Sequence, residues 1–350
     1  MNIIPVTEKE KWNTIVTSFK NWDIYYLHEY ADSLRIHGDG VPYLLYFEFI
    51  AGRLAYVVLQ NDISDLEYYK GTLEKGKYFD WTSPYGYGGP MVEGNLSDDD
   101  IDLVKAELYD FAKANNIVSQ FIRFHPLLHN SSYFEKLCSV VNLKQTVVVD
   151  TESTELIWKN MTPNNRNMVR KAEKNGVKII IDHGERINEF IEIYKQTMDM
   201  RLADEYYYFE NEYFQYLINN FKDNIIFFYA EYQGKIISAS IFLYNNTYMH
   251  YHLSGTLPEF RNLASVNLIL TKAAEWAAQK KINQFHLGGG VEAEDSLFKF
   301  KKIFNRNGLV DFYIGSTIFL KDKFDYLVEL RQQTDSSYDD QKKFMIKYRA

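Results

Sequence analysis

The residues of this sequence that are best suited to chemistry lie between positions 285 and 306. Residues 285–287 have the apolar character of a short buried strand, and Gly288, Gly289 and Gly290 follow directly. Three glycines after a strand let the backbone turn freely and let another molecule approach it closely. After an acidic loop comes a run of phenylalanines and lysines at 298–306 that contains no acidic residue. This run offers fixed cations beside the glycines, where a phosphate or a developing oxyanion could be held.

A plainer structural interpretation of the same residues stays open from their spacing alone. In that interpretation the glycines form a turn, the phenylalanines lie in the core and the lysines form a solvated face, as charged runs usually do. The two interpretations differ in whether a lysine of this run faces bulk solvent or a cavity beside the glycines.

Length and composition fit a globular protein with one large domain or two of ordinary size. The chain has 350 residues, of which 46% are apolar and 16% aromatic, so it can bury a sizeable core and is not disordered. Its 28 tyrosines suit clefts as well as cores, because each carries a polar tip on an apolar body. The single cysteine, Cys138, excludes an internal disulfide and is expected to be a small buried hydrophobe.

The sequence shows no targeting or membrane-spanning signal. Residues 1–12 lack a basic region followed by an apolar core, so we expect no signal peptide. No apolar run approaches the ~18 residues that a bilayer span needs. The formal net charge of −8 argues against a broad surface that coats nucleic acid, although it leaves room for a local basic groove. We therefore expect a cytoplasmic protein, in keeping with its cysteine usage.

A pattern of strand hairpin, helix and strand occurs twice in the chain. The first occurrence has strands at 43–50 and 54–60, a helix at 98–114 that Ser97 and Asp100 begin as a capping box, and a strand at 117–124. The second has strands at 225–232, 236–244 and 248–254, a helix at 265–280 and a strand at 282–287. Residues 112–121 and 277–285 align with a single-residue gap. We therefore predict two structurally similar halves, followed by a strand and a charged helix in the tail from 317.

The best-marked helix lies between these halves. Thr162 suits its N-cap, Pro163 its first position and Gly176 the residue just past its end. Basic residues recur on it at every fourth position, which places them on one face: Arg166, Arg170 and Lys174. That face is either an ordinary solvated surface or a positive patch that binds an anion. A second helical stretch, 185–200, runs into the aromatic residues 206–209.

Metal-site and nucleotide-loop motifs are weak or missing. His250 and His252 alternate on a strand and so share one face, but no third ligand is indicated, and we expect no metal. Residues 86–90 (GYGGP) look like a phosphate loop, yet the Lys-Ser/Thr pair is missing and Pro90 removes a backbone donor. Tyr87, held between glycines, could still line a cleft.

Five stretches together resemble the FemAB-like branch of the GNAT acyltransferase superfamily. They are TSPYGYGGP (82–90), NRNMVRKAEKNGV (165–177), HYHLSG (250–255), HLGGG (286–290) and LFKFKKIFN (297–305). The resemblance implies an α/β (α+β) fold of two tandem GNAT-like domains, each a mixed, mostly antiparallel sheet flanked by helices. It implies a first domain at 1–150 and a second at 151–316 that holds the acyl-transfer cleft. Residues 317–350 would form a C-terminal strand and helix that return to the first domain.

The resemblance also implies which residues act. Lys301 is the implied catalytic cation, because the equivalent lysine of the resembling enzymes lies in the cleft near the acceptor's diphosphate. The predicted substrate-binding residues are Arg166, Arg170, Tyr87, Gly288, Gly289, Gly290, Phe300 and His252. The general base stays open among His252, Glu292 and several tyrosines.

Two features of this sequence differ from those of the enzymes that it resembles. Ordinary acetyltransferases bind the CoA pyrophosphate on a glycine-containing turn at a helix N-terminus. At the matching place Ala264 stands for the first glycine and Val266 for the second, which argues against acetyl-CoA. The long helical-hairpin insertion of some peptidoglycan-bridge members is also missing, as it is in the compact form of the family.

We expect an amide-forming N-acyltransferase that acts on an amine of a cell-envelope precursor, from peptidoglycan or polysaccharide synthesis. The precursor would be a phosphorylated small molecule or lipid-linked. The activated donor would be an aminoacyl-tRNA or an acyl-CoA as co-substrate, with no tightly bound cofactor. The two basic clusters favour tRNA as a partner, whereas the acidic net charge favours acyl-CoA.

Two other classes of function stay open. One is a non-catalytic module that holds a sugar or nucleotide on Tyr85, Tyr87 and residues 206–208. The other is a nucleic-acid-binding protein, whose affinity would fall steeply with salt. Substitution of Lys301 by alanine separates the enzyme from the module, because only the enzyme would lose turnover while it keeps its fold.

Overall fold

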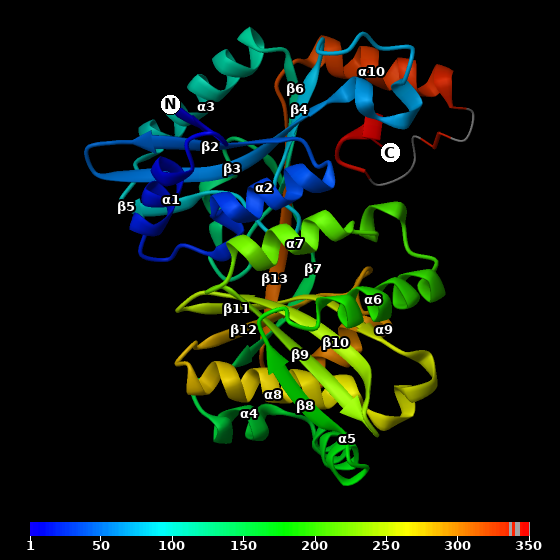
Figure 1. Cartoon of the computed structure of the whole chain (residues 1–350). Coiled ribbons are helices and arrows are strands. Elements are labelled where there is room, and N and C mark those ends of the chain that lie inside the picture. The colour runs from blue at the N-terminus through cyan, green and yellow to red at the C-terminus, as the bar shows by residue number, and fades with distance from the viewer. Residues whose placement is uncertain (336–337, 340–343, 350) are drawn as a thin grey trace. The chain divides into compact units, whose positions relative to one another are not determined.

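The computed structural model describes residues 1–335, 338–339 and 344–349 and divides into two compact units (Figure 1). Unit 1 comprises Met1–Leu143 and Phe312–Ala350, and unit 2 comprises Lys144–Asp311. Two strands begin in one unit and end in the other, β7 (Ser139–Asp150) and β13 (Leu309–Ile318). The domain limits expected at 150 and 316 fall within these same two strands.

Unit 1 is built on a mixed sheet with the strand order β1-β2-β3-β4-β6-β13, and β5 pairs with β3. Neighbouring strands of this sheet are antiparallel except for β4 and β6, which are parallel. The elements of unit 1 besides β13 are β1 (Asn2–Pro5), α1 (Lys9–Ser18), α2 (His28–His37), β2 (Val41–Glu48), β3 (Gly52–Asp62), β4 (Phe79–Thr82), β5 (Met91–Gly94), α3 (Asp98–Ala114), β6 (Ile117–Arg123) and α10 (Lys321–Thr334).

Helix α3 begins where the sequence predicts. The Asp100 N–H donates to the hydroxyl oxygen of Ser97 at 3.2 Å, and the Ser97 N–H donates to the Asp100 carboxylate at 2.8 Å. This capping box satisfies two of the N–H groups that a helix start leaves without partners. The buried residues Val104 and Leu108 then bring one face of α3 into the core of unit 1, against Trp81 of β4.

The C-terminal part of the chain completes unit 1. Strand β13 pairs with β6 over residues 314–318, and α10 packs beside it in a cluster that contains Leu327 and Tyr348. The Arg349 guanidinium donates two hydrogen bonds of 2.6 Å to the carboxylate of Asp80, and the Tyr348 hydroxyl donates a third of 2.8 Å. The sequence predicts the tail strand only from 317, whereas β13 begins at Leu309. Asp311 and Gly315 interrupt the apolar pattern there.

In unit 2 the strands follow the order β7-β12-β11-β10-β9-β8. Strands β11 and β12 are parallel, and the other neighbouring pairs are antiparallel. The elements of unit 2 besides β7 are α4 (Thr154–Asn160), α5 (Pro163–Lys174), β8 (Lys178–Asp182), α6 (Ile187–Arg201), α7 (Asn211–Asn220), β9 (Ile225–Tyr232), β10 (Lys235–Tyr244), β11 (Tyr248–Thr256), α8 (Ser265–Gln279), β12 (Gln284–Gly288) and α9 (Ser296–Lys302).

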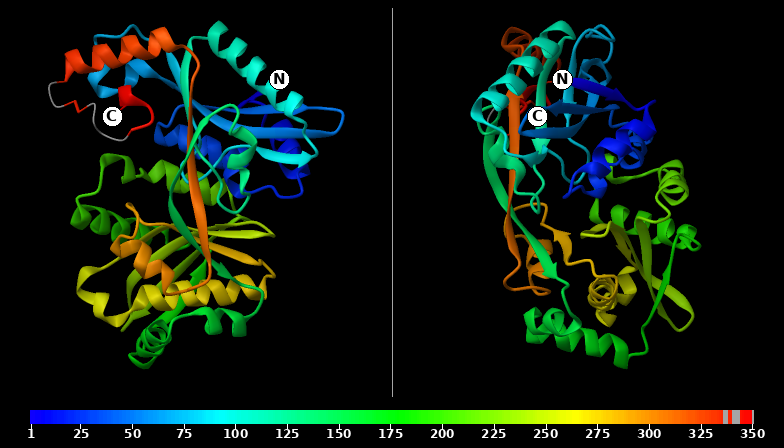
Figure 2. Two further views of the ribbon diagram at one scale, coloured as in Figure 1. Left: turned by 180° about the vertical axis from the view of Figure 1, so that it is seen from behind. Right: turned by 90° about the vertical axis from the view of Figure 1, so that its left-hand side faces the viewer.

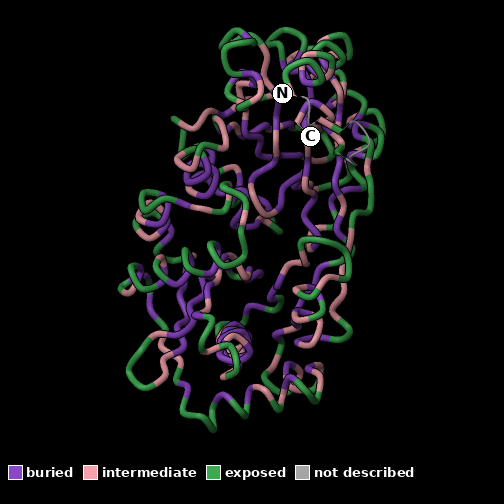
Figure 3. Tube along the Cα trace, turned by 90° about the vertical axis from the view of Figure 1, so that its right-hand side faces the viewer, coloured by how far each residue is buried: buried purple, intermediate pink, exposed green. Residues whose placement is uncertain are grey.

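Two helices cover opposite faces of the unit 2 sheet (Figure 2). On β9, the ring of Phe227 contacts Phe190 of α6 at 6.1 Å, whereas the ring of Phe228 contacts Trp276 of α8 at 6.4 Å. Successive residues of a strand point to opposite faces, so α6 and α8 lie on different sides of the sheet. The buried residues gather along the strands and on α8 (Figure 3), which is the central helix of this core.

The fold class predicted from the sequence is confirmed. Each unit has a mixed, mostly antiparallel sheet flanked by helices, and together they form a tandem GNAT-like arrangement. Within the residues that the structure describes, no helix combines the length and apolar character that a bilayer crossing needs.

Candidate functional site

Strands β11 and β12 pair only near their beginnings. Tyr248, Met249 and His250 of β11 face Gln284, Phe285 and His286 of β12 in parallel register. Beyond this point β11 continues to Thr256, while β12 runs alongside β7 as far as Gly288. The two strands therefore separate after His250 and His286, with Tyr251 on one side and the three glycines on the other.

Each glycine of the bend is required for its own reason. Gly288 has φ 72°, a left-handed conformation that favours glycine. A Cβ at Gly289 would lie 2.9 Å from the carbonyl oxygen of Gln145, and one at Gly290 would lie 2.0 Å from Oδ1 of Asp295. The bend thus has an unusual backbone at its first residue and close neighbours at the other two.

Asp295 ties the bend to the start of α9. Its Oδ1 accepts the N–H of Phe298 at 2.7 Å, which caps the helix, and its Oδ2 accepts the N–H of Val291 at 2.7 Å and of Glu292 at 3.1 Å. Burial raises the pKa of Asp295, but the hydrogen bonds from these backbone N–H groups outweigh it, and the net shift lowers the pKa.

Lys301 projects from α9 onto this bend. The side chain is buried, with the residue only 8% exposed, and its ammonium group donates to the Gly289 carbonyl at 2.7 Å. The same nitrogen lies 5.7 Å from the centre of the Tyr251 ring on β11. Lys301 therefore contacts Tyr251 of β11 and Gly289, the residue directly after β12.

Burial lowers the pKa of Lys301 to about 7. This value already includes the smaller raising effect of the Asp295 carboxylate and the smaller lowering effects of the positive charges of Lys144 and Arg201. Of the two interpretations of the lysine run, the solvated face holds for Lys299, which is exposed, but not for Lys301. A buried amine that titrates near neutral pH can gain or lose its proton as charged groups approach.

Two cations of this group are not identifiable from sequence patterns. Lys144, at the start of unit 2, donates to the carbonyls of Gly290 at 2.6 Å and Val291 at 2.7 Å. Arg201 is exposed at the end of α6, and its charge acts on Lys301 and on Tyr251. A lone lysine in a strand and an arginine at a helix C-terminus are both common surface features, so only the fold brings them to Lys301.

His252 is held as a neutral imidazole. Its Nε2 lies 2.9 Å from the hydroxyl oxygen of Tyr213 on α7. Burial, with a smaller effect of His250, lowers the pKa of His252 to about 3. A group with so low a pKa is a weak proton acceptor at neutral pH, so His252 is better suited to hydrogen bonding than to general-base catalysis.

The two predicted arginines of α5 contact α4. The Arg166 guanidinium donates to the carbonyls of Trp158 at 2.9 Å and Met161 at 2.8 Å, where it satisfies acceptors at the end of α4. The guanidinium of Arg170 lies 5.8 Å from the Trp158 ring. Among the described residues, no hydrogen bond, ion pair or ring contact joins either arginine to Lys301.

The remaining predicted residues lie in aromatic surroundings. Tyr87 belongs to unit 1, where its ring contacts Tyr25 at 5.7 Å, His125 at 5.8 Å and Phe312 at 5.3 Å. Burial raises the pKa of Tyr87 to about 12, so it stays a neutral phenol. Phe300 is half-buried on α9 and contacts Phe304 at 5.5 Å.

The turn before α8 keeps a glycine-like backbone without glycine. Ala264 has φ 56° at the N-cap of α8 and provides no side-chain cap. The hydroxyl groups of Ser265 and Ser238 lie 2.6 Å apart. An alanine in this left-handed conformation costs roughly 1–2 kcal/mol.

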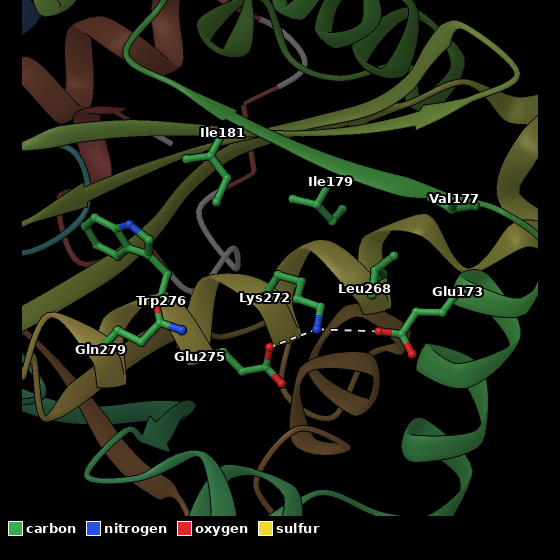
Figure 4. Close-up of a pocket in the computed structure, with 9 residues that line it drawn as sticks. All are labelled: Glu173, Val177, Ile179, Ile181, Leu268, Lys272, Glu275, Trp276 and Gln279. Atoms are coloured by element: carbon green, nitrogen blue, oxygen red, sulfur yellow. Dashed lines mark hydrogen bonds and ion pairs between the residues drawn. The ribbon is translucent and has the colours of Figure 1, made fainter.

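A pocket of about 350 Å³ lies elsewhere in unit 2, between α5, β8 and α8 (Figure 4). Its apolar wall includes Ile179 and Trp276, and its polar edge is Lys272, which points between Glu173 at 3.4 Å and Glu275 at 2.9 Å. None of the residues around Lys301 lines this pocket.

Residues 160–302 match a family model described as "Acetyltransferase (GNAT) domain". No curated protein sequence matches the chain.

Solved structures share the fold along most of the chain. A crystal structure of FemX has a TM-score of 0.66 at 12% identity and covers 93% of this chain and 99% of its own. The C-terminal domain of a putative lysylphosphatidylglycerol synthetase from Agrobacterium fabrum has a TM-score of 0.57 at 13% identity, with 92% and 97% covered. A tandem GNAT protein from the clavulanic acid biosynthesis pathway has a TM-score of 0.51 at 7% identity, with 90% and 98% covered.

At these low sequence identities, the similarities show the fold alone. The resemblance of the sequence to the FemAB-like branch is confirmed at that level. The chain therefore has the tandem GNAT acyltransferase fold found in FemX, and its residues 160–302 match the acetyltransferase (GNAT) domain family.

Proposed function

We propose that this protein is an amide-forming N-acyltransferase that acts on an amine of a phosphorylated cell-envelope precursor. The observation that carries the proposal is the buried ammonium group of Lys301, which lies between Tyr251 and Gly289 where β11 and β12 separate. This lysine is in the segment that matches the acetyltransferase domain family.

The charges around the bend suit acyl transfer. The attacking amine must be neutral, and the tetrahedral intermediate develops a negative charge that a preorganised donor can stabilise by about 3 kcal/mol. Lys301 provides such a donor. Burial lowers its pKa, and an approaching anion raises that pKa again because it favours the charged form. Binding of a substrate phosphate would therefore keep Lys301 protonated. In this proposal Lys301 faces the phosphate or oxyanion, and His252 donates or accepts a hydrogen bond without changing charge.

We favour an aminoacyl-tRNA over an acyl-CoA as the acyl donor. The exposed face of α5 and its flanks carries a row of basic side chains, Lys159, Arg170, Lys171, Lys174 and Lys178. Such a row suits the phosphates of a nucleic acid. Ala264 and Val266 replace the glycines with which ordinary acetyltransferases bind the CoA pyrophosphate. The similar Agrobacterium structure is that of a putative lysylphosphatidylglycerol synthetase, a name that fits an aminoacyl donor.

A mass-shift assay tests the function directly. Purified protein is incubated with charged tRNAs or acetyl-CoA, each with UDP-linked amino sugars and their lipid-linked forms, and the acceptors are analysed by mass spectrometry. We expect an aminoacyl mass shift on a phosphorylated acceptor that Lys301→Ala abolishes and Lys299→Ala, an exposed change on the same helix, leaves intact. Equal turnover by the two variants would refute the role of Lys301.

The alternative of a non-catalytic module has one observation in its favour. Tyr206 and Tyr207 form an edge-to-face pair at 5.6 Å, and the Tyr207 side chain is exposed, as a sugar-stacking platform would be. In that case UDP-sugars would bind without any mass shift, and Tyr207→Ala would weaken their binding more than Lys301→Ala.

A further inference from the structure

Three consecutive carbonyl groups of the glycine bend accept hydrogen bonds from lysine side chains. The Gly289 carbonyl accepts from Lys301 at 2.7 Å. The Gly290 and Val291 carbonyls both accept from Lys144, at 2.6 Å and 2.7 Å. Charge-assisted hydrogen bonds of this length are among the stronger ones in proteins. The position of this backbone therefore depends on two cations from different elements, β7 and α9.

The N–H side of the same backbone is also held. Asp295 accepts from the N–H groups of Val291 and Glu292. The backbone at residue 291 thus lies between the ammonium group of Lys144 and the carboxylate of Asp295. A shift of this segment away from Lys144 would break the hydrogen bonds to Lys144, and a shift toward Lys144 would break those to Asp295.

We propose that Lys144 is a positioning residue that holds the Gly290 and Val291 carbonyls and thereby keeps the Gly289 carbonyl in place to receive the ammonium group of Lys301. Lys144 contacts the bend and acts on Lys301 through it. The proposal rests on the proposed function only in that Lys301 is the group that faces the acceptor.

Lys144 also influences the proton of Lys301. The charged or titratable groups that face Lys301 are Asp295 at the start of α9, Lys144 on β7, Arg201 at the end of α6 and, through its ring, Tyr251 on β11. Lys144 and Arg201 favour the neutral amine, and Asp295 favours the charged one. Removal of the Lys144 charge therefore makes the Lys301 proton harder to lose.

Substrate-free titration of Lys301 tests the proposal. The full-length protein is trace-labelled with acetic anhydride over pH 5–11, and the labelling of each lysine is read by peptide mass spectrometry. Deuterium exchange of the Val291 and Glu292 amides reports the position of the bend. The variants are Lys144→Met, which removes charge and donors, and Lys144→Arg, which keeps both. Lys299→Met is the matched control, because Lys299 is exposed on the same helix as Lys301.

In Lys144→Met we expect the labelling midpoint of Lys301 to rise by about one pH unit. We also expect faster exchange of the Val291 and Glu292 amides. Lys144→Arg and Lys299→Met should match the wild type in both measurements. If Lys144→Met does not fold, Lys144→Gln serves instead, since its uncharged head is too short to reach both carbonyls.

An unchanged Lys301 midpoint together with unchanged amide exchange in Lys144→Met would overturn the proposal. These measurements need no substrate, so a failure to detect acyl transfer leaves their result readable. Where transfer is detected, the pH optimum of Lys144→Met should move in the same direction as the Lys301 midpoint, which a merely structural lysine would not cause.

Discussion

Gly290 and Asp295 are so close that a Cβ on the glycine would lie 2.0 Å from Oδ1 of the carboxylate. Asp295 cannot move away from Gly290 without losing its hydrogen bond from the N–H of Phe298, and this hydrogen bond caps the start of α9. The space beside Gly290 is thus filled by the side chain that fixes the helix carrying Lys301.

Gly290→Ala should therefore reduce transfer at least ~10-fold and cost about 1–2 kcal/mol of stability through the lost cap. The measurement is the transfer rate together with urea unfolding. Gly234→Ala is the control, because Gly234 has φ 80° and nothing near its missing Cβ. It should lose about 1 kcal/mol through backbone strain alone and keep its transfer rate. Equal transfer by both variants would contradict the prediction.

Lys301 should make the protein less stable at acidic and neutral pH than at alkaline pH. Its folded pKa of about 7 lies below the ~10.4 of an unfolded lysine, so between these values the unfolded chain binds more protons and stability rises with pH. Lys301→Met should be more stable than the wild type at pH 6, by on the order of 2–4 kcal/mol. This advantage should shrink steadily from pH 7 to pH 10 in urea unfolding. A difference that does not depend on pH would show that Lys301 is not buried as a neutral amine.

Anion binding should be accompanied by proton uptake. At pH 7.5 Lys301 is mostly neutral, and a bound diphosphate favours its charged form, so the protein should take up between about a half and one proton. Calorimetric titration of a UDP-linked amino sugar in two buffers with different ionisation enthalpies measures this number. Lys301→Gln should abolish the uptake. A binding enthalpy that is independent of the buffer in the wild type would exclude Lys301 as the anion's partner.

His252 should not titrate in the physiological range. With a pKa of about 3 in the folded state, its imidazole stays neutral from pH 5 to pH 8, where an ordinary histidine changes charge. NMR shifts of its ring protons should be flat over this range. The unfolded chain binds this proton from about pH 6.5 downward, so His252 destabilises the fold progressively as the pH falls from 6.5 towards 3. Tyr213→Phe, which removes the hydroxyl partner, tests whether this contact holds the ring in place.

The ion pair of Asp80 and Arg349 should be essential to unit 1. Asp80 is 1% exposed and accepts from the guanidinium of Arg349 and from the hydroxyl of Tyr348. Asp80→Ala leaves the half-buried guanidinium of Arg349 and the buried hydroxyl of Tyr348 without their shared partner, and it should cost about 3–5 kcal/mol in urea unfolding. The control is Asp325→Ala, which removes the exposed partner of Lys321 and should change stability by less than ~1 kcal/mol. Similar losses for both variants would argue against the hydrogen bonds of Tyr348 and Arg349 to Asp80.

Local signals made most elements of the fold predictable. The capping box at Ser97 and the Thr162-Pro163 start of α5 identify helix beginnings because the hydrogen-bonding groups lie within three residues. The start of β13 at Leu309 was not predictable, because β13 is a strand beside β6 and β7, which are far away in sequence. Local patterns predict structure where the contacts are local.

The candidate site follows the same rule. Lys301 and the glycines could be singled out because they lie within one short stretch of sequence. Lys144 and Arg201 reach Lys301 only through the fold, and neither has a neighbour in sequence that marks it. Arg166 stays a prediction, and its contacts with the carbonyls at the end of α4 are ones that no spacing rule on α5 could show.

The hydrogen bonds that join Tyr348 and Arg349 to Asp80 have a consequence for synthesis of the protein. Unit 2 is continuous in sequence, whereas unit 1 needs residues from both termini. During synthesis, all residues of unit 2 therefore emerge from the ribosome before the C-terminal residues that unit 1 needs to complete its core. Asp80 gains its partner only when Arg349 has been synthesised, so unit 1 should become native after unit 2.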